Sequence, residues 1–456
     1  MPPADSDAGP RLRVLVLSTV AFTLLFAVWL MLGMLGIPIS KDLGLTNNQL
    51  YNLTIAAVLA GSLGRFHLGI WADKFGGRKV FTALLLLTVV PTFWVSRATS
   101  YQELLVCAAL YGIAGNSFSA GIAWNAAWWP KDRQGLALGV FGAGNVGASV
   151  TKLVGPFMIA AVPAAGFASG VVPGGWRFIP VLYSGLLVLM AAAVWFLAPA
   201  PDRTPAKGRE FREMLAPLRH PRVWEFSLHY VVVFGAYVAL SGVLPKFYYD
   251  VYGSDLARQI GLSETVVADF GTIKILQGDA YKAYLAAHPG AEAELGTLNK
   301  WIGFLAAVCY VFPASLLRPV GGWLSDRFGP KGVMHAVFWA MLASGVVLSL
   351  PLGLGVWAFT AALFVLGAGM GVGKASVYKM IPDYFPRDVG AVGGLVGLLG
   401  ALGGVLLPLA WAAVPGSTFS ALLALTVAST VWFSADLVVG RRPVPQPVPI
   451  PVTVNN

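Results

Sequence analysis

The sequence predicts an all-α membrane protein with twelve transmembrane helices, arranged as two six-helix halves that are related by an internal repeat. Three observations predict this fold class. Hydrophobic residues make up 57% of the 456 residues and charged residues only 11%, whereas a soluble domain carries about 25% charged residues. Apolar runs long enough to cross a bilayer recur along the chain. One motif of the chain also occurs twice.

The repeated motif joins an arginine to a helix end. Arg65-x3-Gly69-x3-Asp73-Lys74-Phe75-Gly76-x-Arg78 returns as Arg318-x3-Gly322-x3-Asp326-Arg327-Phe328-Gly329-x-Lys331, at a constant offset of 253 residues. The arginine precedes the aspartate by two turns, or about 12 Å of helix. An arginine at that height lies near the middle of a hydrocarbon layer about 30 Å thick. The two copies indicate a duplicated protein.

The apolar runs divide as six plus six around a Pro- and Arg-rich linker. Predicted spans cover 13–37, 50–71, 80–98, 103–127, 135–162, 176–198, 223–248, 301–324, 333–352, 355–378, 390–414 and 418–439. The predicted organisation is a six-helix half at 1–197, a cytoplasmic linker at 198–222, a second half at 223–440 with an external insert at 250–300, and a Pro-rich cytoplasmic tail at 441–456. The insert is interpreted as a small cap, either passive or regulatory.

The distribution of basic residues predicts the orientation. Nineteen of the thirty-one Lys and Arg residues, Arg222 and Lys379 among them, fall in loops of one side, which places both termini in the cytoplasm of a multi-pass inner-membrane (cell-membrane) protein. The net charge of +10 is therefore interpreted as orientation and not as nucleic-acid binding. No cleavable signal peptide is expected. Cys107 and Cys309 lie in apolar runs, which argues against disulfides and metal sites.

Four basic residues remain inside the predicted spans: Arg65, Lys152, Arg318 and Lys374. Every acid is assigned to a loop or a helix end, Glu225 included. A charge at bilayer depth costs at least about 2.5 kcal/mol, so four cations without acidic partners predict an anionic cargo. The planar fork of arginine suits a small planar oxyanion. The two lysines are candidates for proton coupling, with snorkelling toward the interface as an equal alternative.

Two glycine-rich helices are expected to pack closely against a neighbour or a ligand. They read Gly139-x2-Gly142-x-Gly144-Asn145-x-Gly147 and Gly393-Gly394-x2-Gly397-x2-Gly400-x2-Gly403-Gly404. Asn145 adds a polar amide that can donate to an anion. The aromatic residues Phe118, Tyr230 and Phe234 also fall inside spans, where most aromatic residues form core.

Gly69-x3-Asp73-Lys74-x2-Gly77-Arg78-Lys79 and its second copy resemble the loop signature of the major facilitator superfamily. The segments 142–147 and 390–397 are similar to the paired signatures of the nitrate/nitrite porter family. The segments 150–152 and 373–379 are similar to that family's proton-coupled branch, in which Lys152 and Lys374 would act in coupling. The resemblance covers the chain except for the insert and the tails.

The resemblance implies a major facilitator fold and a substrate site. It implies that the anion is held by Arg65 and Arg318, with Asn145, Tyr230, Phe234, Phe118, Gly144 and Gly397 around it. It also implies that the two loop signatures act in gating, through Gly69, Asp73, Arg78, Gly322, Asp326 and Arg327.

The function expected from these features is secondary active transport of nitrate, with nitrite as a further cargo, by alternating access. Nitrate/proton symport for uptake is favoured over nitrate/nitrite exchange, and a small carboxylate such as formate or oxalate is the remaining alternative cargo. The expected protein is a monomer that uses protons and needs no cofactor. A channel, a receptor and an enzyme are the rival classes; without a nucleophile–base pair or a metal-ligand cluster in the spans, we do not expect an enzyme.

Overall fold

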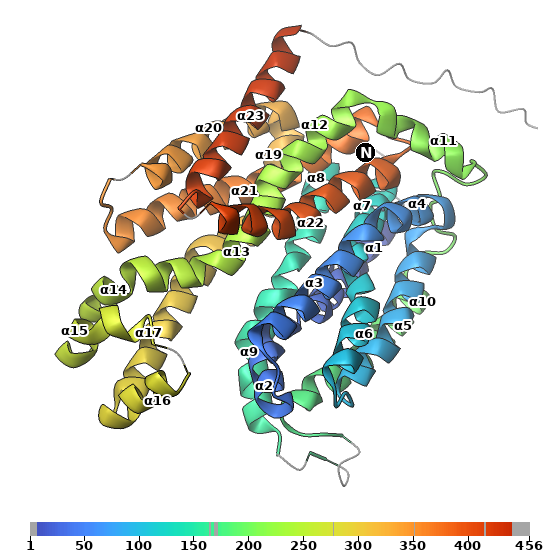
Figure 1. Ribbon diagram of the computed structural model, residues 1–456. Coiled ribbons are helices and arrows are strands. Elements are labelled where there is room, and N and C mark those ends of the chain that lie inside the picture. Colours follow the sequence, from blue (N-terminus) through green and yellow to red (C-terminus); the bar gives the residue numbers. More distant parts are fainter. Residues whose placement is uncertain are drawn as a thin grey trace, which may run out of the picture.

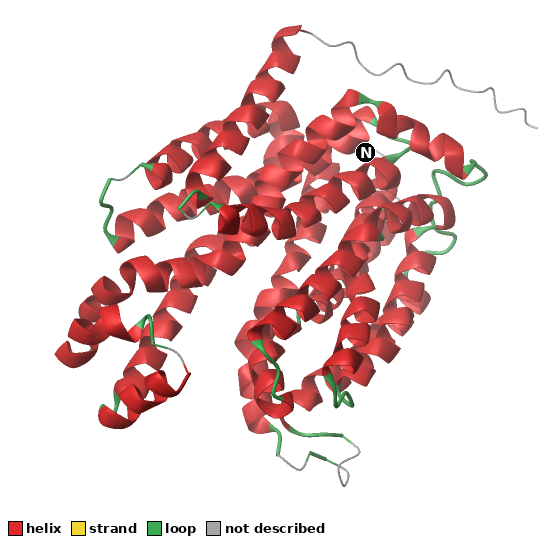
Figure 2. Ribbon diagram, in the orientation of Figure 1, coloured by secondary structure: helices red, strands yellow, loops and turns green. Residues whose placement is uncertain are grey.

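The computed structural model describes residues 7–163, 166–167, 172–276, 278–350, 352–414 and 416–439. In these ranges the regular elements are helices (Figures 1 and 2), apart from an isolated bridge between Phe167 and Val172. Eleven helical stretches of the described residues are long and apolar enough to cross a membrane. The helical path at Gln134–Ala161 supplies the twelfth. The predicted fold class is confirmed, and the predicted tail at 441–456 lies outside the described residues.

The first helix group comprises α1 to α10. Its helices are α1 (Ala8–Trp29), α2 (Leu32–Leu43), α3 (Asn47–Leu63), α4 (Arg65–Phe75), α5 (Gly77–Val95), α6 (Tyr101–Tyr111), η1 (Gly112–Asn116), α7 (Ser117–Trp128), α8 (Gln134–Ala143), η2 (Gly144–Val146), α9 (Gly147–Ala161), η3 (Gly175–Arg177) and α10 (Phe178–Leu197). Several predicted spans are thus interrupted helices. The turn at Gly64, for example, separates α3 from α4 and makes Arg65 the first residue of α4.

The second helix group comprises α12 to α23 and follows the short elements α11 (Phe211–Leu215) and η4 (Ala216–Arg219). Its helices are α12 (Pro221–Tyr230), η5 (Val231–Gly235), α13 (Ala236–Phe247), η6 (Tyr248–Tyr252), α14 (Gly253–Gln259), α15 (Glu264–Ile273), α16 (Gly278–Ala287), α17 (Ala291–Ala306), η7 (Ala307–Val311), α18 (Phe312–Leu316), α19 (Arg318–Phe328), α20 (Pro330–Ser349), α21 (Val356–Tyr384), α22 (Val389–Ala413) and α23 (Thr418–Val439). Two membrane passages continue beyond the expected lengths, over 221–259 and 291–328. A turn at Leu317 separates α18 from α19 in the second of them, as Gly64 separates α3 from α4.

The two groups meet where α4 crosses α22 and where α8 crosses α19. Both crossings are backbone to backbone. A Cβ atom on Gly69 would lie 2.1 Å from the carbonyl oxygen of Gly390, and one on Gly322 would lie 2.0 Å from that of Gly135. Any side chain at these four glycines would force the groups apart, so the repeated glycine sets the spacing of the two crossings.

The repeated aspartates form hydrogen bonds across the same crossings. Asp73 accepts a hydrogen bond of 2.7 Å from the backbone N–H of Gly390 at the start of α22. Asp326 accepts two, from Gly135 at 2.8 Å and Leu136 at 2.7 Å, at the start of α8. A carboxylate at a helix N-terminus is stabilised by the unpaired N–H groups and by the helix dipole. We call these contacts the Asp73 latch and the Asp326 latch, and the end of the molecule that holds them the latch end.

Some charges lie elsewhere than the sequence analysis placed them. Lys379, counted as a loop residue, is buried within α21, where its Nζ lies 3.5 Å from Asp326 and 3.4 Å from Asp383. Arg222, also counted as a loop residue, is buried in α12 beside Glu225. Glu225 is itself buried, and a nitrogen of His229 lies 3.4 Å from its carboxylate. The loop assignments were wrong because charged pairs allow helices to extend past the apolar run.

The linker packs into the latch end. Met214 of α11 is fully buried in a small apolar cluster with Ile70 of α4, Ala206 and Ala391 of α22. The backbone N–H of Ala206 also donates a hydrogen bond of 3.1 Å to the carbonyl oxygen of Asp73. The linker therefore contacts both helix groups where the Asp73 latch joins them.

Candidate functional site

The two repeated arginines begin their helices at the interface between the two groups. Arg65 opens α4 and Arg318 opens α19, and their exposed fractions are 0% and 2%. No ion pair joins either guanidinium to a carboxylate in the described residues. Two buried cations without acidic partners are the dominant electrostatic feature of this region, because removing a charge from water is costly unless a partner compensates it.

Arg65 reaches from the first group toward the second. Its Nε donates to the carbonyl oxygen of Gly61, and its NH1 donates to that of Gly397 in α22, both at 3.1 Å. Its NH2 is buried and has no hydrogen-bond partner among the described residues. The guanidinium lies 5.3 Å from the ring of Trp29. Arg65 therefore carries a donor that is aimed into the interior and remains available.

Arg318 reaches in the opposite direction. Its NH1 donates to the carbonyl oxygen of Gly142 in α8 at 2.7 Å, and its NH2 donates to the hydroxyl of Tyr230 in α12 at 2.8 Å. A Cβ atom on Gly142 would lie 2.8 Å from NH1, so glycine is needed for this approach. Both terminal nitrogens of Arg318 thus have partners.

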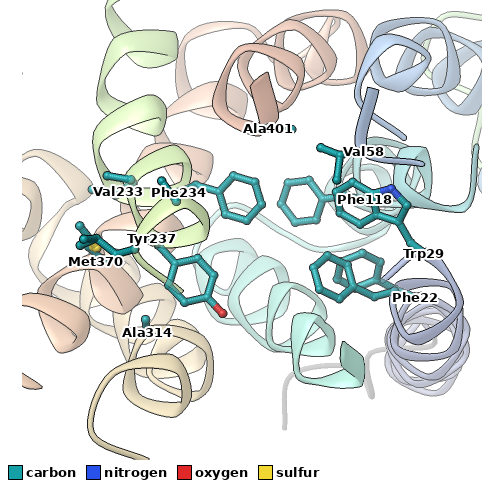
Figure 3. Close-up of a cluster of buried hydrophobic side chains, with 14 of the residues drawn as sticks. Phe22, Trp29, Val58, Phe118, Val233, Phe234, Tyr237, Ala314, Met370 and Ala401 are labelled. Carbon is teal, nitrogen blue, oxygen red and sulfur yellow. The ribbon is translucent and has the colours of Figure 1, made fainter. Parts of the chain in front are cut away.

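The same two phenyl rings contact both arginines. The guanidinium of Arg65 lies 5.7 Å from the ring of Phe118 and 5.8 Å from that of Phe234, and the corresponding distances for Arg318 are 5.2 and 5.9 Å. Figure 3 shows the two rings pointing toward each other. Phe118 belongs to α7 and Phe234 to η5, so each group contributes one arginine and one ring. Cation–π contacts of this kind compensate part of the cost of burying the cations.

Tyr230 connects the ring pair to Arg318. Its ring stacks on Phe234 at 5.0 Å and lies nearly parallel to Phe118 at 6.3 Å. Tyr378 of α21 meets both Phe118 and Tyr230 edge-on, at 5.0 and 4.8 Å. The two guanidinium groups and the aromatic rings therefore share one buried volume at the interface of the groups.

Lys374 lies at the edge of this volume. It is fully buried in α21, and its Nζ donates to the carbonyl oxygen of Ala314 at 3.0 Å. The same atom lies 3.1 Å from the ring centroid of Tyr237 and 5.6 Å from that of Phe234. Phe234 therefore contacts Lys374 as well as both arginines. Lys152 belongs to α9, and its side chain lies outside the described residues.

In the glycine-rich helix of the first group, the glycine that contacts an arginine is not the one that the resemblance selected. Gly142 faces Arg318, as described above. A Cβ atom on Gly144 would instead lie 2.6 Å from the ring of Phe22 in α1, which places Gly144 in a helix-packing contact. Asn145 is buried in η2, and its amide nitrogen has no hydrogen-bond partner among the described residues. Because η2 contacts α1 and α18, Asn145 lies between the two groups.

Gly397 lies beside the arginines. Its carbonyl oxygen accepts from Arg65, and a Cβ atom there would lie 2.8 Å from the hydroxyl oxygen of Tyr378 and 3.3 Å from that of Ser119. Sequence reasoning did not select Trp29, Gly142 or Tyr378 as site residues, although Gly142 belongs to the glycine pattern. Tyr378 follows Lys374 by one helical turn, so the spacing of the two residues could have indicated that they share a face.

The loop-signature cations have different environments in the two copies. The Nε of Arg78 donates to the carbonyl oxygen of Trp195 at 2.9 Å, and its guanidinium lies 4.7 Å from the ring of Trp195. Arg327 is exposed and lies 5.6 Å from Trp323 and 5.4 Å from Phe328. Neither side chain reaches the volume between Arg65 and Arg318.

Comparison with known proteins identifies the family. The model of the Major Facilitator Superfamily matches residues 17–278 and 280–453. A relative in Thermus thermophilus, named as a probable nitrate/nitrite antiporter NarK1, is 52% identical over 451 residues, which cover 94% of this chain and 92% of the relative. The chain belongs to the nitrate/nitrite porters of the Major Facilitator Superfamily.

Other members of this family share most of the length of the chain. The probable nitrate/nitrite transporter NarK2 of Mycobacterium tuberculosis is 31% identical, with 89% of this chain and 88% of the relative covered. The nitrite extrusion protein of Bacillus subtilis is 29% identical, with 89% of each chain covered. Among solved structures, the transporter FucP has the same fold, with a TM-score of 0.63 and 16% identity over 92% of this chain and 98% of that chain. This porter is thus a multi-pass membrane protein.

Proposed function

We propose that this porter moves nitrate, and nitrite as a second cargo, across the cell membrane by alternating access. The observation that carries the proposal is the pair Arg65 and Arg318. These two cations come from opposite helix groups, are buried, have no carboxylate partner among the described residues and contact the same two phenyl rings. The names of the relatives, which refer to nitrate and nitrite, support the choice of anion.

A planar monoanion suits the chemistry of this volume. The buried NH2 of Arg65 offers a donor in the plane of its guanidinium. The positive edges of aromatic rings favour the oxygen atoms of an anion, while the negative faces favour the guanidinium groups. Nitrate is flat and can therefore lie among the rings of Phe118, Phe234 and Tyr230 while it accepts hydrogen bonds at its own edge.

Anion binding would be coupled to movement of the groups through charge. Without cargo, Arg65 and Arg318 repel each other across the interface. A bound anion attracts both and removes part of this repulsion, which favours a state in which the groups are close around the site. Rocking about a site at the middle of the membrane then exposes the anion to one side at a time. In this scheme the two latches close the cytoplasmic side and must open for release.

We further propose that protons accompany the anion. Moving a monoanion into a cell with a negative-inside potential costs about 2.3 kcal/mol of free energy per 100 mV. Uptake therefore requires co-transported positive charge. Lys374 is the candidate carrier, because it is buried, contacts Phe234 of the arginine site and has no ion-pair partner among the described residues. A buried lysine beside other cations releases its proton more readily than one in water.

Nitrate/nitrite exchange is the second candidate, and the name of the 52% identical relative favours it. Exchange carries one monoanion inward for each one outward. It therefore needs neither a titrating group nor net charge movement. Symport predicts that a pH gradient drives nitrate accumulation, whereas exchange predicts that nitrate uptake does not respond to the gradient.

The cargo is tested in proteoliposomes that contain the purified protein. We expect uptake of labelled nitrate that excess unlabelled nitrate or nitrite reduces and that the same concentration of formate or oxalate leaves unchanged. Stronger competition by either carboxylate than by nitrate would contradict the assignment of the cargo.

The coupling mechanism is tested in the same vesicles without internal nitrite. We expect an imposed pH gradient, acidic outside, to drive nitrate accumulation, and Lys374→Gln to reduce this accumulation at least tenfold. Lys246→Gln is the matched control, because the side chain of Lys246 is 80% exposed and its ammonium group pairs with Asp250; this variant should retain the response. Uptake that strictly requires internal nitrite would replace symport with exchange.

A further inference from the structure

A second basic site lies away from the arginine pair. A pocket of about 500 Å³ is lined by the turn between α4 and α5, the end of α10 and the linker. Four cationic side chains and one carboxylate line it: Lys74, Arg78, Lys79, Lys207 and Asp202. The pocket therefore has a surplus of positive charge that the transport site does not use.

The single carboxylate of the pocket has other partners. Asp202 accepts hydrogen bonds from the backbone N–H of Arg78 at 2.8 Å and from the indole N–H groups of Trp124 at 3.0 Å and Trp128 at 2.9 Å. It also accepts from the backbone N–H of Arg203 at 2.8 Å. Asp202 thus holds the linker against the first helix group and forms no ion pair with the cations of the pocket in the described residues.

The lysines of the pocket have no such partners. Among the described residues, no side-chain hydrogen bond or ion pair involves Lys74, Lys79 or Lys207, and the last two are exposed. Arg78 is fixed over the ring of Trp195, as described above. The pocket is therefore a preformed cationic surface in which one arginine is immobilised and three ammonium groups are free to bind an anion.

The depth of the pocket in the membrane indicates what kind of anion fits. The apolar spans that end or begin here are Asn48–Phe75, Gly77–Val95 and Gly175–Leu197, so the pocket lies at the level where hydrocarbon gives way to polar headgroups. Its apolar wall is formed by Phe75 and Trp195, whose exposed fractions are 51% and 41%. The site thus combines cations at the polar boundary with an apolar face toward the lipid chains.

We propose that this pocket binds the phosphate headgroup of an anionic phospholipid, whose acyl chains lie along Phe75 and Trp195. A phosphate between lysines and an immobilised arginine is a common arrangement for recognising anionic headgroups between transmembrane helices. A small free anion could use the cations but not the apolar wall.

The bound lipid would also stabilise the latch end. Thr204 and Lys207 of the linker form one side of the pocket, and Lys74 and Lys79 of the α4–α5 turn form the other. Between them the linker residue Ala206 is hydrogen-bonded to the backbone of Asp73, whose carboxylate forms the latch to α22. A headgroup that bridges the two sides therefore favours the state in which the Asp73 latch is closed.

The proposal is tested on the full-length protein in lipid nanodiscs. We expect nanodiscs that contain phosphatidylglycerol to raise the unfolding temperature by several degrees over nanodiscs of phosphatidylcholine alone. The triple variant Lys74→Gln, Lys79→Gln, Lys207→Gln should lose this difference. The matched control removes three exposed cations elsewhere, Lys246→Gln, Arg258→Gln and Lys300→Gln, and should keep it. An equal stabilisation of the triple variant and the wild type would overturn the proposal.

A second measurement tests whether the ligand is a lipid or a free phosphate. It uses only the wild-type protein, so it does not require the triple variant to fold. Detergent-solubilised wild-type protein is incubated with equal amounts of both lipids, and bound molecules are identified by native mass spectrometry. We expect phosphatidylglycerol to be retained at least fivefold over phosphatidylcholine. Equal retention, or displacement of the phosphatidylglycerol by millimolar glycerol phosphate or inorganic phosphate, would overturn the assignment to a lipid.

Discussion

The two copies of the repeated motif are alike at the latches and different at the arginines. In both copies the glycine makes a backbone crossing and the aspartate caps a helix of the opposite group. At the centre, however, Arg318 has partners at both terminal nitrogens, whereas the NH2 of Arg65 has none among the described residues. The duplication thus preserves the contacts that hold the groups together, while the arginine pair, which we propose as the cargo site, is asymmetric. An anion could therefore bind the NH2 of Arg65 directly, whereas Arg318 would have to break or share one of its present hydrogen bonds.

This comparison is tested most strongly at the arginines themselves. We expect Arg65→Lys and Arg318→Lys each to reduce nitrate uptake at least a hundredfold, because lysine keeps the charge but loses the planar fork. The loss should be larger for Arg65→Lys, since Arg65 carries the unpaired donor. Initial uptake rates in proteoliposomes provide the measurement.

Arg212→Lys is the matched control for these variants, because Arg212 is exposed on the linker. It should transport at the wild-type rate. Near-normal uptake by either arginine variant would remove that residue from the site, and equal losses for the two would remove the asymmetry.

The asymmetry depends on one hydroxyl group. In Tyr230→Phe the NH2 of Arg318 loses its partner and becomes unpaired like that of Arg65, and the ring stacking is retained. A hydrogen bond to a charged group contributes about 1.5 to 3 kcal/mol, so we expect a change in nitrate affinity of about ten- to a hundredfold. Titration calorimetry with nitrate on the purified protein provides the measurement.

The control for this hydroxyl is Tyr310→Phe. The hydroxyl of Tyr310 is equally buried in the second group, but it bonds to the sulfur of Met370 at 3.2 Å. We expect its affinity for nitrate to stay within twofold of the wild type. An unchanged affinity in Tyr230→Phe would show that pairing of Arg318 does not distinguish the two arginines.

The sequence predicted the features within the repeated motif better than the contacts that the motif makes with other helices. The duplicated motif was sufficient to select both arginines and both crossing glycines, because the period of a helix assigns each residue to a face of its own helix. It could not show which backbone atoms of another helix meet that face. The resemblance named Gly144, whereas the structure places Gly142 against Arg318 and Gly144 against Phe22. Trp29 was missed because it lies far from the motif in sequence.

The sequence also did not predict correctly whether charged residues near helix ends belong to the helix or to the following loop. Lys379 was assigned to a loop by composition, yet it extends α21 because Asp326 and Asp383 lie within 4 Å of its ammonium group. Those partners come from a different helix and from the following turn of α21. Composition along one segment cannot reveal a partner that only the packing of two helices brings close.

The smallest expected effect concerns the latches, where the copies are most alike. Asp326 accepts from two backbone N–H groups and lies near the Nζ of Lys379, whereas Asp73 accepts from one N–H group. Replacing a capping aspartate by alanine costs about 0.5 to 2 kcal/mol, and asparagine, which keeps one acceptor oxygen, should cost less. We therefore expect Asp326→Asn to increase the fraction of molecules open at the latch end severalfold, and Asp73→Asn to increase it by less.

The opening of the latch end can be followed by the distance between two spin labels, one on each helix group. The exposed positions Arg133 and Arg387 are suitable for labelling. In the wild type, the population at short distance corresponds to closed latches, and each asparagine variant should transfer part of it to longer distances. Removing the carboxylate charge also weakens its interaction with the helix dipole, so high salt should reduce the difference between wild type and variants. If Asp73→Asn opened the molecule more than Asp326→Asn, the number of capped N–H groups would not determine the strength of a latch, and the linker packed against Asp73 would have to account for the difference.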